Sequence, residues 1–150
     1  MNRFRFRFES LLKVRKAEEE VKKREFGVVL GHLKHEEDQF NRINDSISSL
    51  DEYRENATEG KMTTPRKLSH EFQYSQRLEQ EKSEQEKTLD SVKEVVEEKR
   101  KDLVEATKKK KIFDRLKEKD QGEHNQAELK EEQALIDELS TERFNNKNLE

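Results

Sequence analysis

The stretch GKMTTP, residues 60–65, decides the fold of this chain, because it contains the only proline and one of the four glycines. Long charged segments flank this stretch on both sides, and their apolar residues recur at alternating steps of three and four residues. That spacing is typical of a coiled-coil seam. One break between two seams predicts a single antiparallel hairpin, with both chain ends gathered at the end opposite the turn.

The composition favours a narrow apolar seam over a closed globular core. Of the 150 residues, 45% are charged and only 29% are hydrophobic. An ordinary globular domain is about 45–50% apolar. Disorder is the alternative, because high charge and low hydropathy also mark disordered chains. The regular phase of the apolar residues favours the coiled coil.

The first helix is expected over residues 8–57. Its apolar steps fit a heptad with a phase slip near Phe40. Gly27 and Gly31 lie inside this helix, where each costs about 1 kcal/mol relative to alanine. They either permit close approach of another backbone or are tolerated weak points. The expected seam consists of Phe26, Leu30, Leu33, Phe40, Ile43, Ile47 and Leu50.

The second helix is expected over residues 65–142, after a turn at residues 58–64. Thr64 can cap this helix, and Pro65 suits its first position, where the missing N–H is harmless. Residues 79–88 contain no apolar side chain, so the seam should be soft there. Two lysines at seam positions can cover neighbours with their stems while their ammonium groups stay in water. The expected seam consists of Leu68, Phe72, Leu78, Leu89, Val92, Val96, Lys99, Leu103, Ala106, Lys110 and Phe113.

Folding the chain at the turn brings the two seams into register. Leu33 then faces Leu89, Leu50 faces Phe72 and Phe8 lies opposite Phe113. Roughly 25 residues of the second helix would project about 35–40 Å beyond Phe113. The predicted fold is therefore all-α, a long antiparallel two-helix coiled-coil hairpin that forms one domain over residues 1–150. Its second helix is longer than its first.

Two apolar groups near the chain ends are candidate partner-binding sites. At the N-terminus, phenylalanines alternate with arginines and precede two leucines, and exposed phenylalanine requires a covering surface. That surface is either a partner or the protein's own second helix. Near the C-terminus an apolar stripe without a partner would leave a marginal isolated helix, so a partner is expected there. The candidates are Phe4, Phe6, Phe8, Leu11, Leu12, Leu129, Leu135, Ile136 and Leu139.

A third candidate surface lies near the turn, where Tyr53 and Tyr74 flank the seam and Leu78 follows. Aromatic side chains often anchor protein partners. The alternative is local packing that fastens the end of the hairpin.

The residue types exclude several kinds of chemistry. There is no cysteine, hence no disulfide framework or thiolate metal site. His32 and His35 with Glu36 have a spacing compatible with metal binding, but on a charged helix they are expected to be solvated. No pocket is expected on two helices, so no paired-carboxylate catalysis, cofactor or small-molecule substrate is predicted. The net charge of −3 disfavours nucleic-acid binding, and no apolar run approaches the roughly 20 residues of a membrane span.

Four stretches of the chain resemble the FliJ family of flagellar export proteins. The opening FRFRFESLLKVRKAEEE at residues 4–20 resembles the family's start, although Phe8 stands where leucine is common. LDEYR at residues 50–54 and KKKIFDRL at residues 109–116 are similar to its middle and later segments. EQALIDEL at residues 132–139 resembles the segment near its end, with Ala134 in place of a basic residue.

This resemblance implies a function without catalysis. Family members are antiparallel coiled coils that insert the end with both termini into the hexameric ring of the export ATPase FliI. They also contact the export-gate protein FlhA and handle export chaperones. The resemblance therefore implies a cytoplasmic stalk and chaperone component of flagellar type III export, peripherally associated with the inner membrane through its partners. A generic coiled-coil scaffold or the equivalent stalk of a virulence secretion system is the alternative. The oligomeric state stays open, because two helices can equally pair with a second copy.

Overall fold

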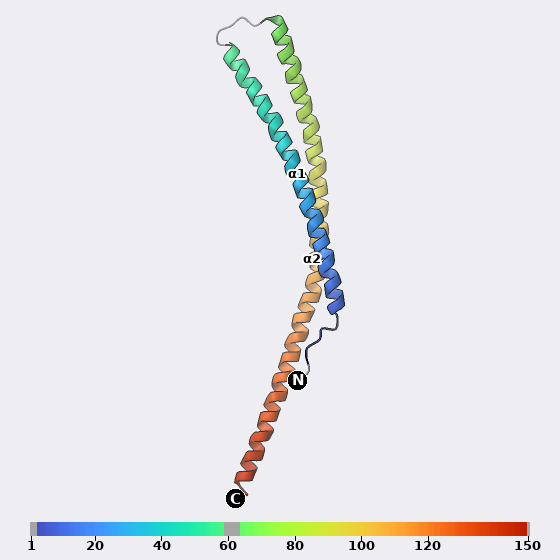
Figure 1. Ribbon diagram of the computed structural model, residues 1–150, viewed down its shortest axis with the longest axis vertical. Coiled ribbons are helices and arrows are strands. Elements are labelled where there is room, and N and C mark those ends of the chain that lie inside the picture. Colours follow the sequence, from blue (N-terminus) through green and yellow to red (C-terminus); the bar gives the residue numbers. More distant parts are fainter. Residues whose placement is uncertain (1–2, 59–63, 150) are drawn as a thin grey trace. The chain divides into compact units, whose positions relative to one another are not determined.

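Two helices make up nearly all of the computed structural model, which describes residues 3–58 and 64–149. Helix α1 spans Glu9–Thr58 and helix α2 spans Pro65–Lys147. The two helices pack against each other in antiparallel directions (Figure 1). The predicted all-α hairpin with a longer second helix is confirmed. Most of the predicted turn, residues 59–63, lies outside the described residues.

The start of α2 agrees with the predicted helix signal. Pro65 is its first residue, and the Leu68 amide donates to the Thr64 carbonyl oxygen at 3.2 Å. Proline suits this position because its φ is already helical and no N–H is lost from the helix. α2 ends at Lys147, five residues beyond the predicted end at 142.

The chain divides into two compact units. The terminal unit contains Met1–Glu20 and Glu105–Glu150, and the central unit contains Val21–Val104. Each unit includes a part of α1 and a part of α2. The single-domain organisation stays a prediction.

The covered face of α1 follows an unbroken heptad, so the predicted phase slip near Phe40 is wrong. Leu30 is 41% exposed, and its neighbour Val29 takes the place in the seam that was predicted for Leu30. Glu36 fills the next position before Phe40. Steps of three and four then alternate without fault, as a continuous seam requires. The buried and half-buried positions of this stripe are Leu12, Arg15, Glu19, Lys22, Phe26, Val29, Leu33, Glu36, Phe40, Ile43, Ile47, Leu50 and Arg54.

Polar side chains continue the covered face of α2 through the stretch without apolar residues. Between buried Leu78 and Leu89, the seam positions are taken by half-buried Lys82 and Gln85. Gln85 Nε2 donates to the Glu36 carbonyl oxygen on α1 at 3.0 Å and also to the Glu36 carboxylate. Hydrogen bonds thus replace apolar contacts at this level of the central unit.

The first two predicted seam residues of α2, Leu68 and Phe72, are exposed. Their assignment to the seam, and the packing of Leu50 on Phe72, are therefore wrong. The apolar contact begins at Leu78, and Arg54 Nη2 donates to the Glu71 carbonyl oxygen at 3.4 Å nearer the turn.

The two seam lysines of α2 pair with carboxylates of α1, one in each unit. Lys99 Nζ lies 3.4 Å from Glu25 Oε2 in the central unit. Lys110 Nζ lies 3.4 Å from Glu19 Oε1 in the terminal unit, where Glu19 is only 4% exposed. Both lysine side chains are partly exposed, at 34% and 25%, so the expectation that their ammonium groups stay in water remains a prediction. A buried charge is tolerated only when it is paired and hydrogen-bonded.

Gly27 and Gly31 offer a direct gain in stability. A Cβ atom built at either glycine meets no other atom within 4 Å, so no other backbone of this chain approaches either glycine closely. We expect Gly27→Ala and Gly31→Ala each to raise the free energy of unfolding by roughly 0.5–1 kcal/mol, because glycine is the more flexible residue in the unfolded chain. Urea unfolding followed by circular dichroism measures this change. Ala17→Gly on an exposed position of α1 is the matched control and should lower stability by a similar amount. A loss of stability in both alanine variants would contradict the prediction.

Candidate partner-binding surfaces

The N-terminal segment lies against α2 of the same chain in the terminal unit. Its residues 3–6 are not helical, and α1 begins at Glu9. Phe4 and Phe8 are half-buried and Phe6 is buried, whereas the intervening Arg3, Arg5 and Arg7 are exposed. This period of two is that of an extended segment with one covered face. Two surfaces were predicted to cover these phenylalanines, a partner or the protein's own second helix. In the structure they pack on the second helix.

Three aromatic contacts fix the path of this segment. The rings of Phe8 and Phe113 are 6.2 Å apart, so the predicted opposition of these two residues is confirmed. The Phe6 ring packs edge-on against Phe8 at 6.0 Å. Further toward the N-terminus, the Phe4 ring lies 5.5 Å from that of His124. Aromatic pairs at such separations stabilise beyond simple area burial.

The position of Phe4 corrects the predicted overhang of α2. The uncovered part was expected to begin beyond Phe113, where α1 runs out. The extended segment instead covers α2 as far as His124, which also lies 3.3 Å from Glu128. The side chains from Leu129 to Leu149 are all exposed.

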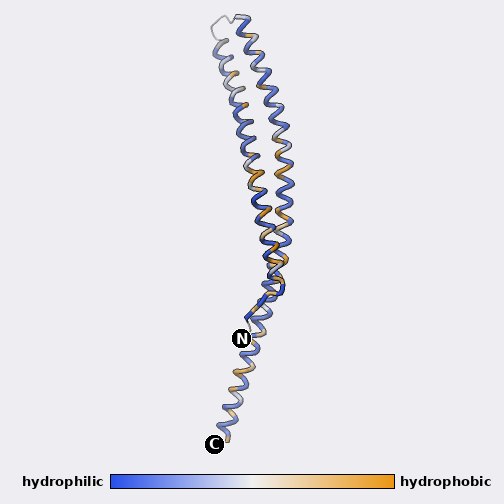
Figure 2. Tube along the Cα trace, turned by 45° about the vertical axis from the view of Figure 1, so that its right-hand side comes forward, coloured by the Kyte–Doolittle hydropathy of each residue, from blue (hydrophilic) through white to orange (hydrophobic). Residues whose placement is uncertain are grey.

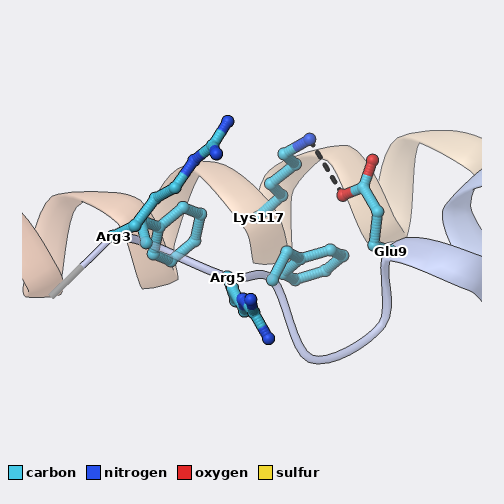
Figure 3. Close-up of a pocket in the computed structure, with 6 residues that line it drawn as sticks. Arg3, Arg5, Glu9 and Lys117 are labelled. Carbon is cyan, nitrogen blue, oxygen red and sulfur yellow. Dashed lines mark ion pairs between the residues drawn. The ribbon is translucent and has the colours of Figure 1, made fainter.

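A pocket of about 440 Å³ lies beside the N-terminal segment, whereas two helices alone were expected to form none. The extended segment supplies the additional wall. Figure 3 shows Arg3 and Lys117 on one side of the two phenylalanine rings and Arg5 on the other, with Glu9 paired to Lys117 at 3.0 Å. The lining residues are Arg3, Phe4, Arg5, Phe6, Glu9 and Lys117. Three cations against one carboxylate suit an anionic or acidic partner group better than acid–base chemistry.

The ion pair of Glu9 predicts a pH effect in this unit. The hydrogen bond from Lys117 lowers the pKa of the Glu9 carboxyl below its usual value. A depressed folded-state pKa means that the pair stabilises the fold above the unfolded pKa of about 4.3 and that this contribution is lost as pH falls through the lower value. We expect a carbon-detected NMR titration to place the Glu9 pKa below that of a free glutamate. Lys117→Gln should return it toward normal, while Lys119→Gln, at an exposed neighbouring lysine, should leave it unchanged. Identical titration curves in all three proteins would contradict the assignment.

The C-terminal part of α2 carries the predicted apolar stripe on a fully exposed helix. Leu129, Leu135, Ile136 and Leu139 are each at least half exposed. Figure 2 shows hydrophobic residues recurring along this part of α2. Phe144 is also exposed and was not predicted as a contact; five residues after Leu139, it lies about 140° around the helix from that residue.

The remaining N-terminal candidates differ in their accessibility. Among the described residues, Leu12 is the most deeply buried large side chain, at 1% exposure, whereas Leu11 is 45% exposed. With Phe6, Leu12 forms part of the small core of the terminal unit, and Leu11 is available to a partner. Partner contacts by any of these residues stay a prediction.

The central unit holds the third candidate surface. Tyr53 and Tyr74 are exposed, as a binding role requires, and Leu78 is buried in the seam. The exposed Leu68 and Phe72 add apolar area on α2, and the prediction did not include them as partner contacts. Their spacing fits the seam, so they were predicted to be covered by α1. Periodicity alone does not distinguish a covered face of a helix from an uncovered one.

The described parts of the chain, residues 3–58 and 64–149, contain no group of three or more His, Cys, Asp or Glu residues placed to hold a metal ion. His32 and His35 are exposed on α1. Within the same ranges, neither helix has a stretch long and apolar enough to cross a membrane.

The comparison with known families covers both the N-terminal FRFRF segment and the hairpin, which is nearly the whole chain. The model of the family described as Flagellar FliJ protein matches residues 4–149. The chain belongs to the FliJ family. This FliJ family member is thus a component of the flagellar export apparatus. No curated protein and no solved structure matches the chain.

Proposed function

We propose that this FliJ family member is a non-enzymatic stalk of the flagellar export apparatus that docks its terminal unit in the central pore of the hexameric export ATPase ring, FliI. The observation that carries this proposal is the exposed apolar stripe Leu129, Leu135, Ile136 and Leu139 on the last part of α2. An isolated amphipathic helix gains little from staying uncovered in water. A pore that surrounds the helix covers its apolar stripe and both charged flanks at once.

The N-terminal segment contributes to the same docking. Leu11 presents an exposed apolar side chain there, and Arg3, Arg5 and Arg7 present exposed cations. Phe4, Phe6, Phe8 and Leu12 support this surface by packing it onto the hairpin. The terminal unit thus offers a basic part and an acidic part, and such charge patterns orient a protein in its partner's socket.

The export gate and the export chaperones are proposed as further partners. Tyr53 and Tyr74 on the central unit provide an exposed aromatic pair for the export-gate protein FlhA, with Leu78 fixing the helix beneath them. Substituting both tyrosines by alanine should weaken the pull-down of FlhA while far-UV circular dichroism shows an unchanged helix content. Loss of helix in this variant would contradict the assignment. Through these partners the protein would stay on the cytoplasmic side at the flagellar base, peripherally associated with the inner membrane.

The experiment that tests ring docking measures ATP hydrolysis by the purified export ATPase. The full chain should stimulate hydrolysis, and a chain lacking residues 125–150 should not. The truncation removes the exposed stripe and leaves α1, the N-terminal segment and their partners on α2 up to His124. Undiminished stimulation by the shortened chain would refute the docking assignment.

A further inference from the structure

A second heptad stripe runs along the uncovered face of α2 in the terminal unit. The covered face uses Ala106, Lys110, Phe113, Lys117, Asp120 and His124. Positions two residues further on lie about 200° around the helix and therefore face away from the N-terminal segment. These positions continue in faultless steps of four and three, and all are exposed: Lys108, Ile112, Arg115, Lys119, Gly122, Gln126, Leu129, Gln133 and Ile136. A stripe with this period fits another helix.

The helix surface around the two halves of this stripe carries opposite charge. Residues 108–119 contain seven basic and two acidic side chains, of which Lys110 and Lys117 pair with Glu19 and Glu9 on the covered face. Residues 128–142 contain six acidic side chains and one basic, and these charges flank the uncharged stripe positions. A basic half and an acidic half on one straight helix complement a second such helix only when the two run antiparallel. The same chain therefore provides a partner of matching charge.

One antiparallel alignment matches the apolar residues as well. Ile112 is 64% exposed in the middle of the basic half, and Ile136 is 56% exposed in the acidic half. Setting Ile112 of one copy against Ile136 of a second copy also sets Lys111 opposite Asp137. Because the alignment is self-complementary, every contact occurs twice, as in a two-fold symmetric dimer.

Gly122 supports the same alignment near the centre of the stripe. It falls opposite Gln126 of the other copy, and a Cβ at Gly122 would meet nothing within 4 Å in the single chain. The absent side chain therefore has no explanation within the hairpin, whereas it lets a second helix approach closely.

We propose that two copies of this protein associate through the exposed face of α2, with the acidic C-terminal half of each helix packed on the basic half of the other. A chain cannot make this contact with itself, because residues 105–147 lie in one uninterrupted helix. The dimer covers the stripe that ring docking would use, so the two states exclude each other. The inference rests on charge and exposure in the terminal unit and does not depend on ring docking being correct.

Engineered cysteines test the alignment, because the natural chain contains none. A mixture of full-length Ile112→Cys and Ile136→Cys proteins should form a disulfide-linked dimer under mild oxidation. Each variant alone should form little, because like positions lie far apart in this alignment. Ile112→Cys mixed with Glu138→Cys is the matched control, since residue 138 is exposed but lies about 200° around the helix from residue 136. Equal cross-linking in all mixtures, or none in the first, would overturn the proposal.

Sedimentation of charge variants gives an independent test. Lys111→Glu should weaken the dimer by about tenfold in Kd, because two attractive pairs become repulsive. Adding Asp137→Lys should restore it, which a merely unfolded variant could not do. Stimulation of the export ATPase by Lys111→Glu should persist, so a failure of dimerisation and a failure of ring docking are distinguishable. A full-length protein that sediments as a monomer at every concentration overturns the proposal.

Discussion

Leu12→Ala should destabilise the protein by about 2–5 kcal/mol, the range for removing a fully buried leucine from a packed site. Leu12 is 1% exposed and is the most completely buried large side chain among the described residues. The apolar core of the terminal unit is small, since Phe6 and Ala106 are the other buried apolar side chains among the described residues of that unit. Few neighbours can therefore move to fill the cavity. A total stability of about 5–15 kcal/mol is typical, so the loss would be a large share.

The adjacent Leu11 is the matched control. It is 45% exposed, so Leu11→Ala should cost less than about 1 kcal/mol. Urea unfolding measured by circular dichroism gives both values, and hydrogen exchange of α1 amides tests whether the terminal unit opens first. Equal losses for the two leucines would contradict the burial pattern.

A triple substitution, Leu135→Ser, Ile136→Ser and Leu139→Ser, should abolish stimulation of the export ATPase. Each of these side chains is about half exposed in the free protein and would be covered in the ring. Losing roughly 1 kcal/mol or more per side chain weakens docking by about a hundredfold in Kd or more. ATP hydrolysis measured against the concentration of added protein gives the change directly.

The control triple must match the change in helix propensity. Lys130→Ser, Ala134→Ser and Asn145→Ser are exposed positions on the same part of α2 that face away from the stripe, and serine is a weaker helix former than lysine or alanine. The control should retain stimulation. Loss in both triples would point to unfolding of this part of α2, and retention in both would remove the apolar stripe from the docking surface.

The hairpin and much of its register followed from local sequence. Pro65 is acceptable only at a helix start, so the boundary of α2 was well determined. The contact of Phe8 with Phe113 followed from two seams read separately and folded about one turn. Family membership could also be anticipated from the FRFRF opening, since such a run is uncommon in coiled coils.

The details that failed depended on which of two neighbouring side chains faces the partner helix. Val29 and Leu30 are both apolar, so the pattern alone did not choose between them, and the position of polar Glu36 in the seam was missed. The path of Phe4 to His124 was missed although the alternation of phenylalanine and arginine predicts an extended segment. Periodicity gives the covered face of such a segment but not the surface that covers it.

The paired charges within the seam restrict how the hairpin can transmit a signal. Some coiled coils communicate when one helix slides past the other by a heptad. Here a slide in one direction would carry Glu19 from Lys110 to Leu103 and strand a buried carboxylate. The opposite slide would carry Glu25 from Lys99 to Ala106. The first slide would also carry Glu25 from Lys99 to Val92, so each direction breaks at least one of the two pairs. Any mechanical message passing along this protein should therefore travel by rotation or bending of the helix pair, without sliding of one helix along the other.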